Sequence, residues 1–213
     1  MYLVIAGQHG FAVELAKLIL AKGQTKVALI VRDKDIAVQL SNSLNAIVVN
    51  ADATDTKTLD ELNLKECDAF IAATDSEKTN VLSALYAKNA GAKKIFVKVD
   101  NPESESILEK LGFVPIMADH FAARTVELMI TRPAVSDLVN IGIGQFDIIE
   151  MQAKGTKLIG KELSSAKGKH YTTIATCSES KYCFTKEKKI DSKETVILLV
   201  DSGKEKEVEK ELK

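Results

Sequence analysis

The stretch Tyr2-Leu3-Val4-Ile5-Ala6-Gly7-Gln8-His9-Gly10-Phe11-Ala12 begins as an apolar run and reaches a glycine at its midpoint. An apolar run without polar alternation is typical of a strand buried on both faces of a sheet. Apolar residues then recur at the spacing of one helix face, at Phe11, Leu15, Leu18 and Ile19. We therefore expect a buried strand, a glycine turn and an amphipathic helix over Phe11–Lys22.

The same alternation of short apolar strands and helices continues along the first half of the chain. The expected strands are Tyr2–Ala6, Val27–Val31, Ala46–Val49, Ala69–Ala73, Ile95–Val99 and Val114–Met117. The further expected helices are Asp35–Leu44, Thr56–Leu62, Ser76–Asn89, Ser104–Leu111 and His120–Thr131. Because crossovers between parallel strands are right-handed, this order predicts a Rossmann-like, doubly wound parallel sheet of the α/β class. Ligands bind such sheets at the carboxyl ends of the strands.

The pattern changes from Leu138 onward, where alternating strands and charged turns replace the strand–helix rhythm. We expect strands over Phe146–Gln152, Tyr171–Cys177 and Thr195–Val200, and helices over Lys157–Ser165 and Lys204–Leu212. These elements predict a second, smaller α+β domain. The expected domains are residues 1–131 and 136–213, with the boundary near Arg132–Ser136.

Composition excludes several classes of protein. The 213 residues are 46% hydrophobic and 28% charged, as in ordinary soluble proteins, and the net charge of −1 favours no nucleic-acid partner. No apolar run approaches the roughly 20 residues needed to cross a bilayer, and the first residues do not resemble a signal peptide. A cytoplasmic protein is expected.

Residues that could carry catalysis or bind a metal are scarce. Cys67, Cys177 and Cys183 lack metal-ligand spacing and fit a reducing compartment, with Cys177 and Cys183 flanking an expected hairpin turn at Ser178–Lys181. None of the three histidines stands in a recognisable nucleophile or metal motif. We expect no catalytic residues and no metal ligands.

The glycine loop matches a dinucleotide-binding fingerprint only in part. Gly7 fills the position of the tight turn, and Ala12 is acceptable where helix and strand pack closely. His9 occupies the position where a glycine normally lets the backbone approach a pyrophosphate, and Gly10 comes one residue late. Two interpretations stay open: a retained nucleotide site, or a fold that has lost or altered its ligand.

The end of the second strand also departs from the fingerprint. The carboxylate that usually binds the ribose hydroxyls is replaced by Val31. Asp33 could take its place or simply cap the next helix. Arg32 could face an added phosphate or solvent.

The remaining strand ends supply further candidates at the same edge of the sheet. Asp52 and Ala53 could border an adenine ring, or belong to a loop in which Thr54 or Asp55 caps a helix. Thr74 and Asp75 follow the fourth strand. Lys98 closes the fifth strand, where its ammonium group could reach a phosphate or stay solvated.

A series of motifs resembles the regulatory subunits of Trk and Ktr potassium-uptake systems, which contain RCK domains. The matching stretches are Val4–Gly7, Asp52–Asp55, Ala72–Ser76 with Asn80, Lys98–Glu103 and Leu108–Gly112. Two later stretches, Lys157–Leu163 and Asp191–Val196, resemble the small C-terminal domain of that family. The nucleotide-binding residues expected from pattern and resemblance together are Gly7, Gln8, His9, Gly10, Phe11, Arg32, Asp33, Asp52, Ala53, Thr54, Thr74, Asp75 and Lys98.

The resemblance implies a regulatory protein rather than an enzyme. In this family, paired domains assemble into a ring, commonly of eight copies, beneath a potassium-translocating membrane subunit. A helix at about His120–Thr131 would link each domain to its partner. Bound NAD(H), ATP, ADP or, in some members, calcium shifts the ring between states.

Two departures leave the ligand open. The arginine that the family often has at the position of Gly10 is absent, and Val31 replaces the ribose acid. NAD(H), ATP, ADP or AMP, or an empty site, all remain compatible with the pattern. The alternatives from other classes are a small NAD(P)-dependent oxidoreductase and a transcription regulator, although no DNA-reading element is evident.

Overall fold

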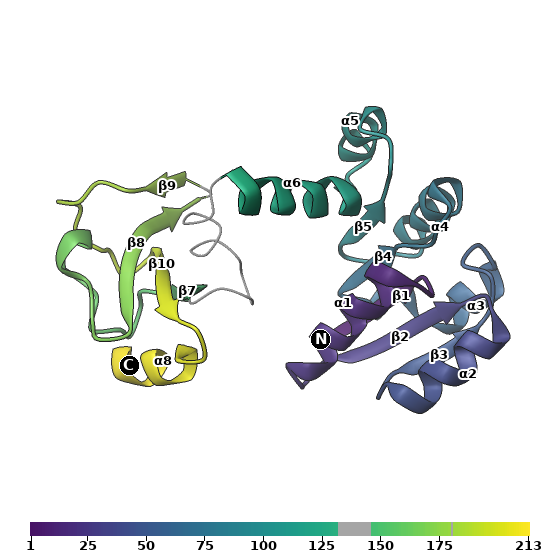
Figure 1. Cartoon of the computed structure of the whole chain (residues 1–213), viewed down its shortest axis with the longest axis horizontal. Helices are drawn as coiled ribbons and strands as arrows, with labels where there is room; N and C mark the ends of the chain where they lie inside the picture. Colours follow the sequence, from purple (N-terminus) through teal and green to yellow (C-terminus); the bar gives the residue numbers. More distant parts are fainter. Residues whose placement is uncertain (132–145, 180) are drawn as a thin grey trace. The chain divides into compact units, whose positions relative to one another are not determined.

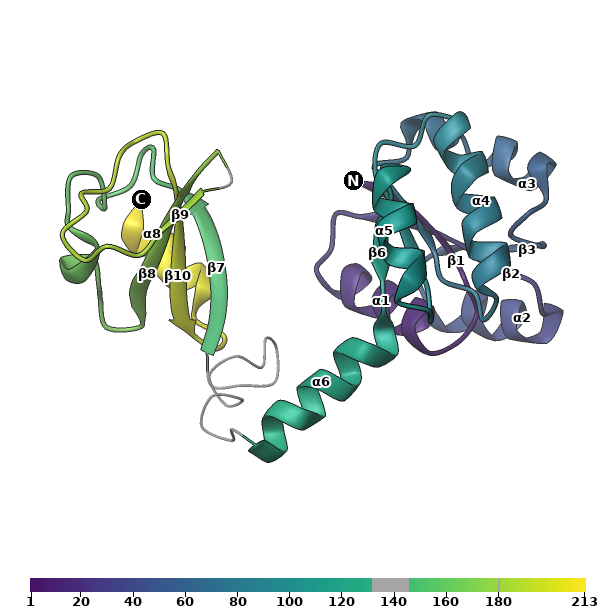
Figure 2. The same ribbon diagram turned by 90° about the horizontal axis from the view of Figure 1, so that it is seen from above.

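A computed structural model describes residues 1–131, 146–179 and 181–213, which form two compact units (Figures 1 and 2). Internal contacts divide the chain into Met1–Ala122 and Ala123–Lys213. The expected boundary near residues 132–136 lies outside the described residues. Each unit is therefore described by itself.

The first unit contains a six-stranded, entirely parallel sheet of order β3-β2-β1-β4-β5-β6. Its strands are β1 Tyr2–Ala6, β2 Lys26–Val31, β3 Ile47–Asn50, β4 Ala69–Ala72, β5 Ile95–Lys98 and β6 Val114–Ile116. The order reverses between β1 and β4, which is the point where doubly wound sheets bind ligands. The expected Rossmann-like fold and all six expected strands are confirmed, with ends shifted by at most a residue.

Helices cover both faces of this sheet. They are α1 Gly10–Ala21, α2 Lys34–Ser43, α3 Thr56–Glu61, α4 Glu77–Asn89 and α5 Glu103–Lys110, with a short 3₁₀ helix at Leu64–Glu66. A further helix, α6 Ala118–Thr131, buries none of its residues and continues past Ala122, where the first unit ends. One apolar core joins α1 and α2 to Leu3 and Ile5 of β1, and the other joins α3, α4 and α5 to Val4 and Ala6. Alternate residues of one strand thus enter opposite cores, which explains its uniformly apolar sequence.

The prediction of the buried face of α1 is wrong at one position. Leu18 is 58% exposed, whereas the fully buried residues of this helix are Ala12 and Ala16. Small residues face the sheet because the helix follows directly from Gly7 and packs close to β1. Phe11, Leu15 and Ile19 contact the core from the flanks of that stripe.

The second unit is built on an antiparallel sheet of order β7-β10-β8-β9. Its strands are β7 Phe146–Gln152, β8 Tyr171–Ser178, β9 Lys181–Cys183 and β10 Thr195–Asp201, and its helix is α8 Glu205–Leu212. Val208 and Leu212 of α8 pack against Val196, Leu198 and Val200 of β10. The expected strands and C-terminal helix are confirmed, and β9 is an additional strand.

The helix expected over Lys157–Ser165 is wrong. The segment forms turns and a 3₁₀ helix at Leu163–Ser165. Gly160 adopts a φ of +79°, in the left-handed region, and its N–H donates to the carbonyl of Ile190 at 2.9 Å. The Ile190 N–H in turn donates to Lys161 at 3.0 Å, so pairing with a distant segment replaces local helical bonds.

Cys177 and Cys183 are free thiols. Cys183 lies opposite Thr176, and Cys177 lies opposite Tyr182. Successive residues of a strand face opposite sides of a sheet, so the two cysteines point away from each other. This register disfavours a disulfide between them.

Candidate functional site

Four strand ends of the first unit surround one cavity of about 170 Å³. Its lining residues follow β1, β2, β3 and β4, and the cavity therefore lies at the carboxyl edge of the sheet, beside the switch point. They are Gly7, Gln8, Ile30, Arg32, Ala51, Asp52, Ala53, Thr74, Asp75, Ser76 and Thr79.

Gly7 forms the floor of the glycine loop, where no side chain fits. A Cβ at this position would lie 2.4 Å from the carbonyl oxygen of Ala73 and 2.6 Å from the Cβ of Ala12. The Gly7 N–H donates to the carbonyl of Ile30 at 3.1 Å. Three parallel strands thus converge here, and only glycine allows it.

His9 is exposed and begins α1 without capping it through its side chain. Its Nε2 lies 3.1 Å from Nε2 of Gln8, which itself lines the cavity. His9, Gly10 and Phe11 are not among the cavity's lining residues. The imidazole therefore stands at the outer rim of the loop.

The end of β2 presents a cation to the cavity rather than a carboxylate. Val31 is fully buried, and Asp33 accepts the N–H groups of Asp35 at 2.9 Å and Ile36 at 3.0 Å as the cap of α2. Of the two interpretations of Asp33, the structure favours the cap. Arg32 lines the cavity, is exposed and forms no ion pair with another described residue.

The loop after β3 is held by its own side chains. Asp52 accepts hydrogen bonds from the Thr54 hydroxyl at 2.7 Å and the Thr54 N–H at 2.9 Å. These two bonds lower the pKa of Asp52, and the nearby charge of Arg32 lowers it further. Asp55 caps α3 through the Lys57 N–H, at 3.3 Å. Asp52 is thus an ionised carboxylate at the cavity wall.

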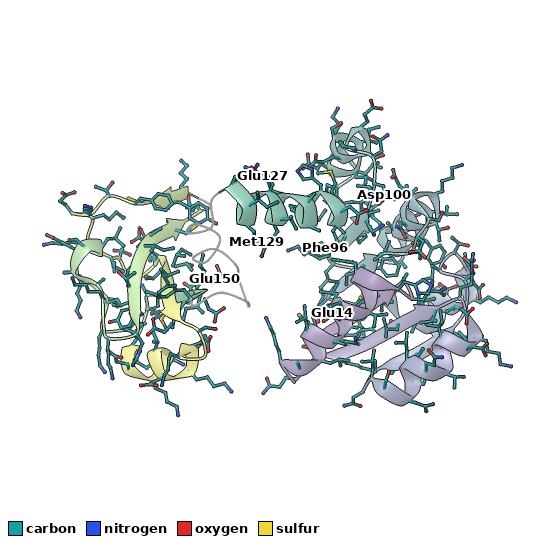
Figure 3. All side chains as sticks on the ribbon, in the orientation of Figure 1. Glu14, Phe96, Asp100, Glu127, Met129 and Glu150 are labelled. Atoms are coloured by element: carbon teal, nitrogen blue, oxygen red, sulfur yellow. The ribbon has the colours of Figure 1, made fainter. Side chains whose placement is uncertain are left out.

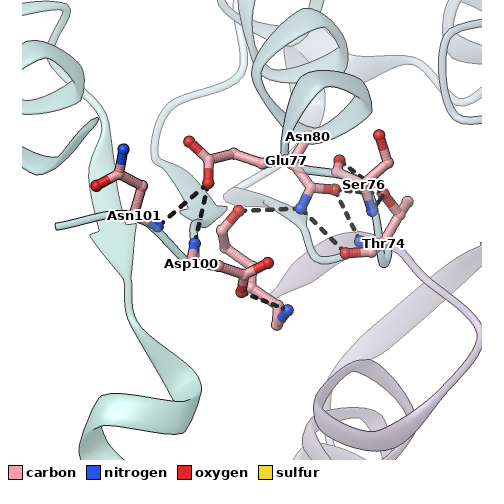
Figure 4. Close-up of polar contacts among 7 residues, drawn as sticks. Thr74, Ser76, Glu77, Asn80, Asp100 and Asn101 are labelled. Atoms are coloured by element: carbon pink, nitrogen blue, oxygen red, sulfur yellow. Dashed lines mark hydrogen bonds and ion pairs between the residues drawn. The ribbon is translucent and has the colours of Figure 1, made fainter. Parts of the chain in front are cut away.

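Asn80 fixes the loop after β4. Its side chain, 1% exposed, accepts from the N–H and hydroxyl of Thr74 at 2.8 and 2.7 Å. Its amide nitrogen donates to the carbonyls of Thr74 at 3.1 Å and Lys98 at 3.0 Å (Figure 4). One buried amide thereby ties the cavity wall to the end of β5.

Glu77, on the first turn of the same helix as Asn80, fixes the segment that precedes α5. Its carboxylate accepts the N–H groups of Asp100 at 3.0 Å and Asn101 at 3.3 Å (Figure 4). It also accepts a hydrogen bond from the Ser104 hydroxyl at 2.6 Å. The Ser104 hydrogen bond, followed by that of Asp100, lowers the pKa of Glu77. Lys98 pairs with Asp100 at 3.0 Å and lies outside the cavity lining.

The cavity includes part of the set of residues expected from sequence. Those on its wall are Gly7, Gln8, Arg32, Asp52, Ala53, Thr74 and Asp75. Those outside the lining are His9, Gly10, Phe11, Asp33, Thr54 and Lys98. Four further residues line the cavity without having been expected from the sequence: Ile30, Ala51, Ser76 and Thr79. Ser76 and Thr79 lie one helical turn apart at the start of α4, a spacing that could have indicated them.

Metal binding and membrane insertion both bear on the described part of the chain. No cluster of three His, Cys, Asp or Glu residues there could hold a metal ion. No helix there has the length and apolar character needed to span a bilayer.

The first unit matches a known family. The TrkA-N domain matches residues 3–120. The TrkA homologue of the Trk potassium uptake system of Methanothermobacter thermautotrophicus is 34% identical over 164 residues, which cover 76% of each chain. The Vibrio alginolyticus Trk potassium uptake protein TrkA is 32% identical over 180 residues, or 81% of this chain but only 38% of that protein.

A solved structure of the GsuK channel bound to NAD superposes with a TM-score of 0.55 at 16% identity, covering 94% of this chain and 37% of GsuK. At that identity the superposition shows a shared fold. The family match over more than half of the chain, together with the methanogen relative, is decisive. The chain belongs to the TrkA-N domain family.

Proposed function

We propose that this protein is a cytoplasmic regulatory subunit of a potassium-uptake system, and that an adenine nucleotide in the cavity controls it. The observation that carries the proposal is the cavity at the switch point of a TrkA-N fold. The names of the relatives from Methanothermobacter and Vibrio support the potassium system, and the NAD of the GsuK structure supports the ligand class.

A nucleotide acts in this scheme by shifting a population of states. It favours whichever arrangement of the protein binds it more tightly, and it transmits only that difference in affinity. No covalent step is needed. Two residues of α4 connect the cavity wall to the segment before α5: Asn80 binds Thr74 and the Lys98 carbonyl, and Glu77 binds the Asp100 N–H and the Ser104 hydroxyl.

Nucleotide binding is tested by thermal shift and calorimetry with NAD⁺, NADH, ATP, ADP and AMP. We expect at least one of them to stabilise the protein, since a ligand that binds only the folded state raises the melting temperature. Gln8→Ala, on the cavity wall, should weaken binding. Gln39→Ala, the same change at an exposed position of α2, is the matched control.

The potassium role is tested in cells lacking this gene. We expect impaired growth at low external potassium and rescue by the wild-type chain. Purification from membranes should retain a multi-pass potassium-translocating subunit. If the protein instead oxidises NADPH or NADH with a carbonyl substrate, the small oxidoreductase is the correct assignment.

We also propose that the protein forms homodimers that assemble into a ring. The family resemblance implies eight copies in that ring. Exposed large apolar side chains are typical of interaction surfaces, and they are most numerous on α4 and α6, whereas α1, α2 and α5 have one each. Those on α4, α5 and α6 are Leu82 and Leu85 on α4, Ile107 on α5, and Phe121, Val126, Met129 and Ile130 on α6. On α6, Met129 and Glu127 extend from opposite sides in Figure 3, so the helix is amphipathic although none of its residues is buried.

Light scattering coupled to gel filtration tests this assembly. We expect Leu82→Glu to reduce the oligomer, because it places a charge in an apolar contact. Val38→Glu, an equally exposed apolar position on α2, should leave the oligomer intact. A monomeric wild-type chain would contradict this part of the proposal.

We also propose two domains: residues 1–131 form the nucleotide-binding domain, and residues 136–213 form the C-terminal domain.

A further inference from the structure

The end of β2 carries an inference about which nucleotide the cavity selects, and it rests on the proposed nucleotide-binding function. In this fold the adenosine ribose lies beside the end of the second strand. A carboxylate there accepts the ribose 2′-hydroxyl of NAD, whereas an arginine accommodates the 2′-phosphate of NADP. The side chains at the end of β2 therefore indicate whether the ligand carries a hydroxyl or a phosphate at the 2′ position of its ribose.

The described residues offer no carboxylate in the ribose position. Val31 takes the place of the acid and is completely buried among the residues that pack α1 and α2. Asp33 is two residues further on, but its Oδ1 atom is committed to two backbone N–H groups of α2. Its own N–H donates to Gln8 at 2.9 Å, which fixes the position of this cap.

Arg32 is held at the edge of the cavity by its backbone. The side-chain amide of Asn50, the residue paired with Val31 across the sheet, donates to the carbonyls of Val31 and Arg32, each at 2.9 Å. The guanidinium group lines the cavity and forms no ion pair elsewhere in the described chain. Its donors remain available, and a guanidinium group binds phosphate through two parallel hydrogen bonds.

The carboxylates at the cavity do not fully neutralise the positive charge of Arg32. Asp52 lies near Arg32 but makes no direct ion pair with it, and one of its oxygens already accepts two hydrogen bonds from Thr54. Asp75 lies on the wall formed after β4. A ribose hydroxyl would find no carboxylate from β2, while a phosphate would find an unpaired guanidinium group.

We propose that the cavity selects adenosine nucleotides that carry a 2′-phosphate, and that Arg32 determines this specificity. The ligand class includes NADP(H) and excludes NAD(H) as the preferred form. Arg32 supplies two hydrogen bonds and one positive charge, and Val31 withholds the carboxylate that would repel the phosphate.

Matched ligands test the proposal by calorimetry with the full chain. They are adenosine 2′,5′-bisphosphate, its 3′,5′ isomer of equal charge, and AMP, with NADP⁺ and NAD⁺ as the dinucleotide pair. We expect adenosine 2′,5′-bisphosphate to bind at least about tenfold more tightly than its 3′,5′ isomer or AMP, and NADP⁺ at least about tenfold more tightly than NAD⁺. A factor of this size is the usual effect of hydrogen bonds to a charged group.

Two substitutions test whether Arg32 causes the preference for a 2′-phosphate. Arg32→Ala should remove it while the protein still binds AMP, and the exposed position of Arg32 makes misfolding no concern. Lys34→Ala removes the same charge two residues away, at an exposed position outside the cavity lining, and should keep the preference.

Each contrary result has a distinct meaning. Equal affinity for AMP and the 2′,5′-bisphosphate overturns the specificity and leaves nucleotide binding intact. Equal affinity for the two bisphosphate isomers overturns the role of a 2′-specific contact, because charge alone would explain binding. If none of the nucleotides binds, the proposed nucleotide control fails along with the specificity.

Discussion

At the scale of single residues, two side chains organise the wall of the cavity. Asn80 makes its four hydrogen bonds from a fully buried position, and Glu77 collects three donors from the loop before α5 and its first turn. Removing the partner of a buried polar group such as the Asn80 amide is costly. The network is therefore sensitive to single substitutions.

Replacing Asn80 by alanine should lower the free energy of unfolding by about 2–3 kcal/mol, since it leaves the Thr74 N–H and the Lys98 carbonyl without a partner. Urea denaturation measures this loss. Asn89→Ala, at the exposed end of the same helix, is the control and should change stability little. Helix propensity favours alanine over asparagine at both positions, so it cannot explain a loss. An equal change in both variants would contradict the role of the hydrogen bonds of Asn80.

Glu77 should make stability depend on acidity. Its pKa is lowered in the folded protein from the ordinary value of about 4.5, so its carboxylate stabilises the fold above that value. This contribution is lost as the pH falls through the lower pKa of the folded state. Glu77→Gln should therefore be less stable than wild type at pH 7, and the difference should narrow toward pH 3. Denaturation curves across this range measure it. A difference independent of pH would contradict the assignment.

At the scale of elements, the entry into α1 explains the position of the cavity. The turn at Gly7 lets the helix start directly above β1, with Ala12 and Ala16 against the sheet. Longer side chains would push the helix outward and change the spacing between the glycine loop and Thr74. The cavity thus depends on small residues in a stretch of only ten positions.

Gly7→Ala tests this dependence. The added methyl group meets the Ala73 backbone and the Ala12 side chain, and overpacking of this kind costs about 1–3 kcal/mol. Gly10→Ala is the comparison, because the space around that Cβ is open although its φ is +40°. We expect the larger drop in melting temperature and in nucleotide affinity for Gly7→Ala. The reverse order would mean that backbone strain, not contact, limits the loop.

At the scale of the whole molecule, the chain contains separate hydrophobic cores. Two lie on the faces of the parallel sheet, and a third packs the C-terminal sheet against α8. The division into two compact units predicts that a defect in one core stays local.

Leu198→Ala and Leu29→Ala form a matched pair, since both leucines are fully buried, one in each unit. Each should cost about 2–5 kcal/mol through lost burial and the cavity left behind. Hydrogen exchange should show faster opening only in the unit that carries the substitution. Equal acceleration in both units would mean that they unfold as one.

The pattern of the sequence was sufficient for the strands, most helices and the doubly wound parallel sheet, whereas the strand order comes from the structure. Short, uniformly apolar runs rich in β-branched residues favour buried strands, and crossovers between parallel strands have one hand. The two predictions that were wrong concern positions that depend on distant partners. The segment Lys157–Ser165 pairs with residues 186–190, and Leu18 is displaced outward by the close packing of Ala12 and Ala16.

The residues of the cavity divide in the same way. The motif at each strand end was visible in the sequence, because parallel strands bring their carboxyl ends to one edge. Only the tertiary structure decided how each side chain is used: it commits Asp33 to a helix cap, pairs Lys98 with Asp100 and leaves Arg32 on the cavity wall. The physical reason is that a hydrogen bond depends on positions in space, which local periodicity does not encode.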